Sequence, residues 1–251
     1  MRIAVIGGGA AGFMAAITAK QSSPKSEVFL FEKSNKLLSK VKVSGGGRCN
    51  VTNACFSISE LSKKYPRGGA FLKKSFHYFF TKDTIDWFES RGVKLKAEND
   101  NRMFPITDNS QTIIDCLFRE CEKEGVDIKL NNTIKKITKT DIGFNLKINE
   151  NVIQFDRVII ATGGNAKKQG FDWLSDLGLT IVDPVPSLFT FNMPSEKVKD
   201  EISASPGYEF NKNNSVIATS GKNKIKFDII QQGFAWIADN KIEKKMVKVM
   251  K

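Results

Sequence analysis

Residues 1–32 read MRIAVIGGGAAGFMAAITAKQSSPKSEVFLFE, and this stretch decides the fold class. Four apolar residues, 3–6, stop abruptly at a glycine, which is typical of a buried strand followed by a tight turn. Small and apolar residues over about 10–20 then predict a helix, and the apolar run at 27–31 predicts a second strand. A short basic start before an apolar stretch also resembles a signal peptide, but the abrupt stop favours the strand. A strand, a helix and a second strand in this order predict an α/β, Rossmann-like fold.

Three glycines in the first turn have the spacing G-x-G-x-x-G of a dinucleotide-binding site. Gly7 permits the tight turn, Gly9 leaves room for a pyrophosphate beside the backbone, and Gly12 allows close packing of helix on strand. The expected helix begins near Ala10 and Ala11 and points its positive N-terminus at the phosphates. The alternative is a glycine-rich turn that binds no ligand.

The second strand ends in Glu32, an acid placed to accept a hydrogen bond from a ribose hydroxyl. An acid at this position favours the unphosphorylated adenosine ribose of FAD or NAD over NADP.

A second glycine-rich stretch, KLLSKVKVSGGGRCNVTN, follows at 36–53. Consecutive glycines adopt positive φ and expose backbone N–H groups, so this loop is a candidate for a second cofactor contact. Arg48 and the neighbouring lysines could neutralise a pyrophosphate. A flexible surface loop is the alternative.

These stretches resemble the BaiN/YhiN-type bacterial flavoproteins, a family described as aminoacetone-oxidase-like FAD-binding proteins. The resemblance rests on GGGAAG, on FEK at the end of the second strand, and on KLLSKVKVSGGGRCNVTN. NRMFPITDNSQTIIDCL at 101–117 and VIIATGG at 158–164 extend it to about residue 188.

The resemblance implies a Rossmann-like FAD domain of the glutathione-reductase type over residues 1–188. Residues 189–251 would form part of an inserted, β-rich substrate domain and a divergent basic tail. The implied cofactor-binding residues are Gly7, Gly9, Ala10, Ala11, Gly12, Glu32, Lys33, Ser44, Gly45, Gly46, Gly47, Arg48, Cys49, Asn50, Thr162, Gly163 and Gly164.

The resemblance also implies an FAD-dependent oxidoreductase in the cytoplasm, with NADH or NADPH as electron donor and a small organic molecule as acceptor. Hydride would pass through flavin N5. The family pattern of a later L-S-G-P segment and a returning glycine-rich stretch is missing, so a truncated remnant that at most binds FAD or a nucleotide is the main alternative. The sequence predicts neither a catalytic acid nor an oligomeric state.

Cys49 and Cys55 raise a lesser alternative, a redox-active disulfide of the disulfide-reductase kind. Their C-x₅-C spacing has one residue more than the C-x₄-C of those enzymes, which disfavours closure of the bridge. Cys116 and Cys121 are expected to be core thiols. His77 is the only histidine, so no histidine-based metal site is expected, and FLKKSFHYFF at 71–80 is expected to be a half-buried helix.

Composition excludes several other classes. The chain has 251 residues, of which 41% are hydrophobic, too many for a disordered protein, and four cysteines are too few for a disulfide scaffold. No apolar run is long enough to cross a membrane. The net charge of +12 is concentrated in residues 33–74 and 211–251. Without a recognised nucleic-acid motif, this charge alone predicts no specific nucleic-acid partner.

Overall fold

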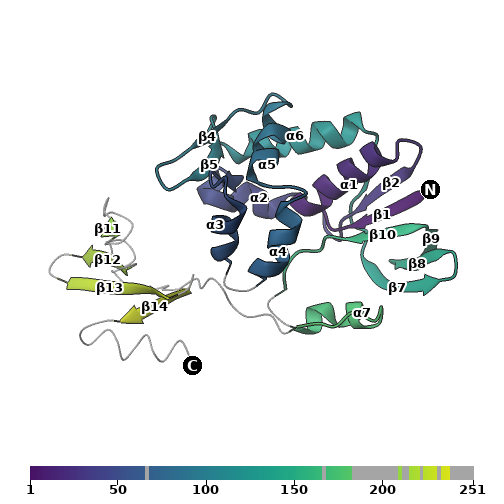
Figure 1. Cartoon of the computed structure of the whole chain (residues 1–251). Coiled ribbons are helices and arrows are strands. Elements are labelled where there is room, and N and C mark those ends of the chain that lie inside the picture. Colours follow the sequence, from purple (N-terminus) through teal and green to yellow (C-terminus); the bar gives the residue numbers. More distant parts are fainter. Residues whose placement is uncertain are drawn as a thin grey trace. The chain divides into compact units, whose positions relative to one another are not determined.

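The computed structural model describes residues 1–65, 68–165 and 168–182, and the strands between residues 209 and 237. The chain divides into two compact units, Met1–Pro184 and Val185–Lys251. The first unit contains all of the helices and the parallel sheet in the described part of the chain (Figure 1).

The centre of the first unit is a parallel sheet with the strand order β10-β1-β2-β6. Its strands are β1 (Arg2–Ile6), β2 (Glu27–Phe31), β6 (Asp127–Lys129) and β10 (Arg157–Ile160). β1 lies between β10 and β2, and layers packed on both faces of the sheet bury its side chains, which explains its continuous apolar sequence. β10 lies at one end of this strand order and is half-buried.

Helices cover one face of this sheet. α1 (Ala10–Ser22) and α6 (Ser110–Lys123) pack side by side there, with α2 (Ser39–Val43) against α6 (Figure 1). Ile3 and Val5 of β1 and Leu30 of β2 point into this layer. α1 confirms the predicted helix.

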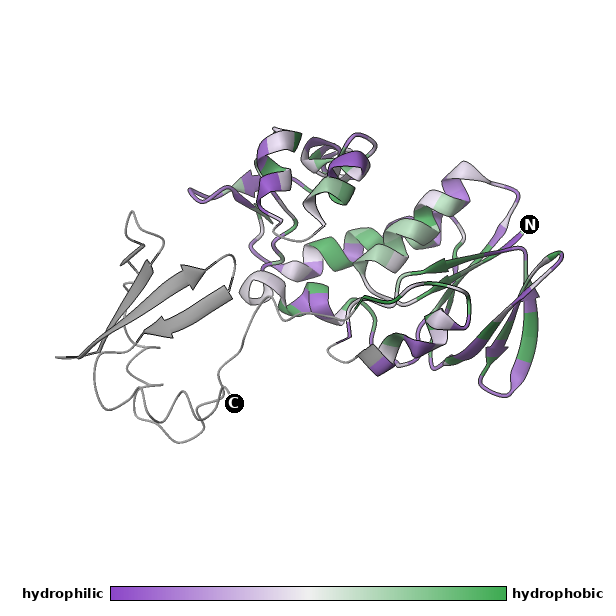
Figure 2. Ribbon diagram, turned by 60° about the horizontal axis from the view of Figure 1, so that its bottom comes forward, coloured by the Kyte–Doolittle hydropathy of each residue, from purple (hydrophilic) through white to green (hydrophobic). Residues whose placement is uncertain are grey.

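A small antiparallel sheet covers the other face. It consists of β7 (Ile134–Thr140), β8 (Gly143–Ile148) and β9 (Asn151–Phe155). Ala4 and Ile6 alternate with the residues that face the helices, and they pack with Leu146 and Phe155. In Figure 2 hydrophobic colour is concentrated on the strands and helices of this layered core.

A second small antiparallel sheet follows the second glycine-rich stretch. β3 (Thr52–Asn53), β5 (Arg102–Pro105) and β4 (Leu95–Ala97) form a three-stranded sheet, accompanied by α3 (Ile58–Lys63), α4 (Gly69–Phe76) and α5 (Thr81–Glu89). The expected half-buried helix corresponds to α4, in which Leu72 and Phe76 are half-buried, and His77, which follows its last residue, is exposed.

A short helical segment ends the described part of the first unit: η2 (Lys168–Phe171) followed by α7 (Asp172–Ser175). The second unit contains a four-stranded antiparallel sheet of β11 (Glu209–Phe210), β12 (Ser215–Ser220), β13 (Asn223–Ile230) and β14 (Gly233–Ile237). The basic end of the tail lies outside the described residues.

Candidate functional site

The turn after β1 has no room for side chains at two of its glycines. Gly7 has φ +114°, and a Cβ there would lie 2.4 Å from the Ala161 carbonyl oxygen. A Cβ on Gly12 would lie 1.8 Å from the Gly7 carbonyl oxygen. Both separations are far below van der Waals contact, so glycine is required by the protein's own packing at these two positions.

Gly9 is different, because a Cβ built on it would meet no protein atom within 4 Å. It is the N-cap of α1, no side chain caps the helix, and no acid lies in its first turn. Ala10 and Ala11 are exposed as well, although the next turn is buried. The first N–H groups of a helix have no intrahelical partner, so this end of α1 is an open site for an anion such as a pyrophosphate.

Glu32 lies at the end of β2, where backbone groups hold its carboxylate. The Gly8 N–H donates to Oε2 at 2.9 Å, while the Ser34 N–H and hydroxyl donate to Oε1 at 3.0 and 2.9 Å. Partial burial alone would raise the pKa of Glu32, but these hydrogen bonds and the charge of Lys33 lower it below its usual range. Glu32 is therefore a carboxylate at neutral pH and an acceptor for a hydroxyl group.

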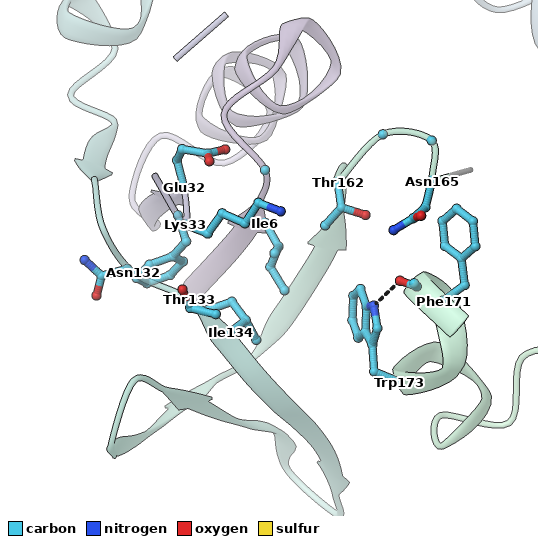
Figure 3. A pocket seen from close by; sticks show the side chains of 15 residues that line it. Ile6, Glu32, Lys33, Asn132, Thr133, Ile134, Thr162, Asn165, Phe171 and Trp173 are labelled. Carbon is cyan, nitrogen blue, oxygen red and sulfur yellow. Dashed lines mark hydrogen bonds between the residues drawn. The ribbon is translucent and has the colours of Figure 1, made fainter. Parts of the chain in front are cut away.

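Glu32 lines a cavity of about 230 Å³ at the carboxyl ends of β1 and β2. Figure 3 shows its two walls, with Glu32, Lys33 and β7 on one side and the turn after β10 with Trp173 on the other. The indole N–H of Trp173 donates to the Gly170 carbonyl at 3.2 Å. The lining residues are Ile6, Gly7, Phe31, Glu32, Lys33, Asn132, Thr133, Ile134, Thr162, Gly163, Gly164, Asn165, Gly170, Phe171 and Trp173.

The cavity therefore brings together six of the residues expected from the sequence: Gly7, Glu32, Lys33, Thr162, Gly163 and Gly164. The expected residues 44–50 do not line it. They belong to η1 (Ser44–Gly47) and the turn that follows, in which Gly45, Gly46 and Gly47 all have positive φ.

The second loop is tied to the β4–β5 hairpin. A Cβ on Gly45 would lie 2.7 Å from the Phe104 ring and 2.9 Å from the Asn50 nitrogen. Arg48 stacks over the same Phe104 ring at 4.0 Å and donates to Glu98 at 2.5 Å. These contacts give Arg48 a role in holding the loop.

Lys40 lies beside the turn after β10, whose residues 162–164 line the cavity. A Cβ on Gly163 would lie 3.7 Å from its Nζ atom, so its ammonium group is beside the turn after β10. The sequence pointed to lysines near Arg48 in general terms but did not single out Lys40. No local signal distinguishes it, because its neighbour Gly163 is more than a hundred positions later in the chain.

Gly8 and Asn132 were also not foreseen. A Cβ on Gly8 would lie 2.3 Å from Leu37 and 3.0 Å from Glu32, and its carbonyl accepts from the Leu38 N–H at 2.8 Å. The run of three glycines at 7–9 could have indicated that Gly8 also belongs to the site. Residues 132–134 reach the cavity because the Asn132 N–H donates to the Glu32 carbonyl at 2.9 Å.

Cys49 and Cys55 are free thiols. Cys49 is buried with φ +63°, and burial raises its pKa to about 11. Cys55 donates to the Ser57 carbonyl at 3.6 Å. A protonated, buried thiol is the reverse of the activated thiolate that disulfide exchange needs. Cys116 and Cys121 are fully buried, as expected of core thiols.

Within the described ranges no set of three or more His, Cys, Asp or Glu side chains is placed to hold a metal ion. Over the same residues, no helix combines the length and the apolar character needed to cross a membrane.

The residues present fit FAD on three structural grounds: the open space at Gly9, the uncapped start of α1, and the carboxylate of Glu32 beside the cavity. Together with the parallel sheet they define an FAD-binding Rossmann domain. The particular family follows from comparison with known sequences. A sequence model described as "HI0933-like protein Rossmann domain" matches residues 1–243, and the chain belongs to this family. The match continues well past residue 188, where the motif resemblance ended.

Two curated relatives have reductive chemistry in their names. The chain is 30% identical over 193 residues to the 3-dehydro-bile acid delta(4,6)-reductase of Clostridium scindens, which covers 74% of this chain and 46% of that protein. It is 29% identical over 202 residues to the ribosomal RNA dihydrouridine synthase of Escherichia coli, and this match covers 75% of this chain and 47% of that protein. The chain thus spans about half the length of the curated relatives it matches.

Solved structures agree on the fold. The fumarate reductase subunit FrdA of E. coli matches with a TM-score of 0.51 at 19% identity, over 66% of this chain and 33% of that one. A 3-ketosteroid dehydrogenase of Rhodococcus jostii matches with a TM-score of 0.50 at 17% identity, over 68% and 47%.

Proposed function

We propose that this chain holds the adenosine and pyrophosphate half of FAD in an oxidoreductase that takes hydride from NADH or NADPH and reduces a ring carbon–carbon double bond. The observation that carries the proposal is the contrast among the glycines: Gly7 and Gly12 are required by packing, whereas Gly9 faces open space at the uncapped start of α1. The two relatives named above, a bile-acid reductase and a dihydrouridine synthase, support reduction of a ring as the reaction class.

Bound FAD would supply two-electron chemistry, accepting hydride at N5 and donating it to the acceptor. In balance, one reduced nicotinamide and one proton saturate one double bond, and the nicotinamide leaves oxidised. The chain's own part is binding and orientation. In this proposal the start of α1 and Lys40 bind the pyrophosphate, and Glu32 binds the ribose, as the open helix start and the carboxylate beside the cavity support.

Absorption spectroscopy tests this function on the purified full chain. We expect a flavin spectrum that persists through gel filtration and is bleached when NADH or NADPH is added without oxygen. A flavin-bound protein that neither nucleotide bleaches would refute the donor assignment and leave the binding role standing.

The Gly9→Ala variant tests the site itself. Because its Cβ touches no protein atom, we expect an unchanged thermal unfolding midpoint. We expect at least about tenfold weaker FAD binding, because the methyl group obstructs hydrogen bonds from the helix start to a charged pyrophosphate. Thr18→Ala, an exposed position later in α1, is the matched control. Equal FAD affinity in the Gly9 variant would refute the proposed pyrophosphate position.

A further inference from the structure

The exposed face of α4 carries aromatic side chains that the fold does not use. Phe71 is 75% exposed, and Tyr78 is 90% exposed. Tyr78 lies in the turn that continues α4, held by its N–H to the Ser75 carbonyl at 2.9 Å. Phe71, Lys74 and Tyr78 are spaced i, i+3 and i+7, which places them along one side of the helix.

The packing of α4 is supplied by a different set of residues. Leu72, Phe76 and Phe80, spaced i, i+4 and i+8, are half-buried. The Phe76 ring lies 6.0 Å from Tyr65 and 5.3 Å from Phe80. The outer aromatics are therefore surplus to the anchoring of the helix, and large aromatic side chains gathered in solvent mark an interaction surface.

The charge of this region indicates the partner. Residues 56–82 contain six Lys or Arg and a single acid, Glu60, which pairs with Lys63 at 2.7 Å. Lys73, Lys74 and Lys82 make no ion pair within the described part of the chain. None of these residues lines the cavity, so the cofactor does not account for their charge.

A partner that pairs with the lysines and stacks on the exposed aromatic rings must carry repeated negative charges and flat apolar groups. Single-stranded nucleic acid has both, as phosphates and unstacked bases.

We propose that the α4 face, defined as Phe71, Lys74 and Tyr78, binds single-stranded nucleic acid together with Lys73, which lies on an adjoining side of the helix. The rings of Phe71 and Tyr78 stack on bases, while Lys73 and Lys74 contact phosphates. The proposal is independent of the reaction at the flavin, because binding is read without any turnover. It revises the expectation drawn from charge alone, since the aromatic exposure was not foreseen.

Fluorescence anisotropy of the purified full chain with labelled oligonucleotides tests the proposal. One arm uses single-stranded RNA, a second uses single-stranded DNA of the same sequence, and a third uses the duplex. We expect both single strands to bind more tightly than the duplex, since paired bases cannot stack on the rings. A preference for RNA or for DNA then identifies the natural source of the strand. Duplex binding that equals single-strand binding overturns the stacking role.

Two variants separate stacking from charge. Phe71→Ala with Tyr78→Ala should weaken single-strand binding at least about tenfold. Lys73→Gln with Lys74→Gln should reduce the slope of log K against log salt by roughly 1.4, the value for two lost phosphate contacts. The matched control is Lys136→Gln with Lys139→Gln at two exposed positions of β7, which should bind as the parent does.

The proposal is overturned if the chain does not bind single strands, or if the control variant loses as much single-strand affinity as the α4 variants. It is also overturned if the chain binds anionic lipid vesicles as tightly as single strands and the aromatic variant loses that vesicle binding too. A lowered thermal midpoint in Phe71→Ala/Tyr78→Ala together with absent binding would show instead that the rings are covered within the chain. Flavin content, measured on each variant by absorbance, keeps a failure of the flavin proposal distinct from a failure of this one.

Discussion

Single residues in this site divide into those that serve the fold and those that remain for a ligand. Gly7 and Gly12 are fixed by carbonyl oxygens of the protein itself. Arg48, the most conspicuous cation of the second loop, is held by Glu98 and Asp108 at 2.5 and 3.6 Å. Lys40 remains beside the turn after β10. The chemistry of a residue type therefore indicates a site only when its partners in the fold are known.

Glu32 makes a prediction about pH at this scale. Its pKa is lower in the folded chain than in the unfolded one, so the stabilisation is complete above the unfolded pKa of about 4.3 and is lost as the pH falls through the folded value. We expect the difference in unfolding free energy between the parent and Glu32→Gln to be larger at about pH 7 than at about pH 3. Urea unfolding at both pH values measures it, and a constant difference would contradict the lowered pKa.

At the scale of elements, a buried ion pair joins the end of α5 to α6. The Arg91 Nε–H donates to Glu120 Oε2 at 2.9 Å, and the Glu120 side chain is only 5% exposed. Arg91 also stacks on the Trp87 ring at 4.0 Å. This pair fixes the packing of α6, whose N-terminus is tied to α2 by the hydrogen bond from Ser110 Oγ to the Lys42 carbonyl.

Glu120→Ala should lower the free energy of unfolding by about 3–5 kcal/mol, because it leaves the Arg91 charge without its buried partner. Chemical denaturation measures the change. Glu60→Ala removes an exposed partner of Lys63 on α3 and is the control, for which we expect no measurable change. Similar effects of the two substitutions would argue against the burial of the Arg91–Glu120 pair.

On the scale of the whole molecule, the flavin site joins segments from far apart in the chain. The cavity is lined from residues 6–33, 132–134 and 162–173. A ligand that binds only this assembled arrangement stabilises the folded chain by mass action.

Added FAD should therefore raise the free energy of unfolding by about 2.7 kcal/mol when the free cofactor is at about 100 times its Kd. Thermal unfolding in a series of FAD concentrations measures the shift. The gain should shrink in Gly9→Ala at equal FAD and stay unchanged in Thr18→Ala. An unfolding midpoint that does not depend on FAD would contradict a preformed site.

The β1–α1–β2 unit, the positions of its glycines and the acid at its end can all be predicted from the amino-acid sequence. These are local features, set by strand and helix periodicity and by the few conformations that a tight turn allows.

Which side chains come into contact depends on the tertiary structure. Arg48 faces Glu98, fifty positions later in the chain, and Lys40 lies beside Gly163. Residues 132–134 reach the cavity through sheet packing, and the exposure of the α4 face is set by how the other segments pack around α4. Such contacts join residues distant in sequence, so no local pattern specifies them, and they determine which charges hold the fold and which remain for ligands.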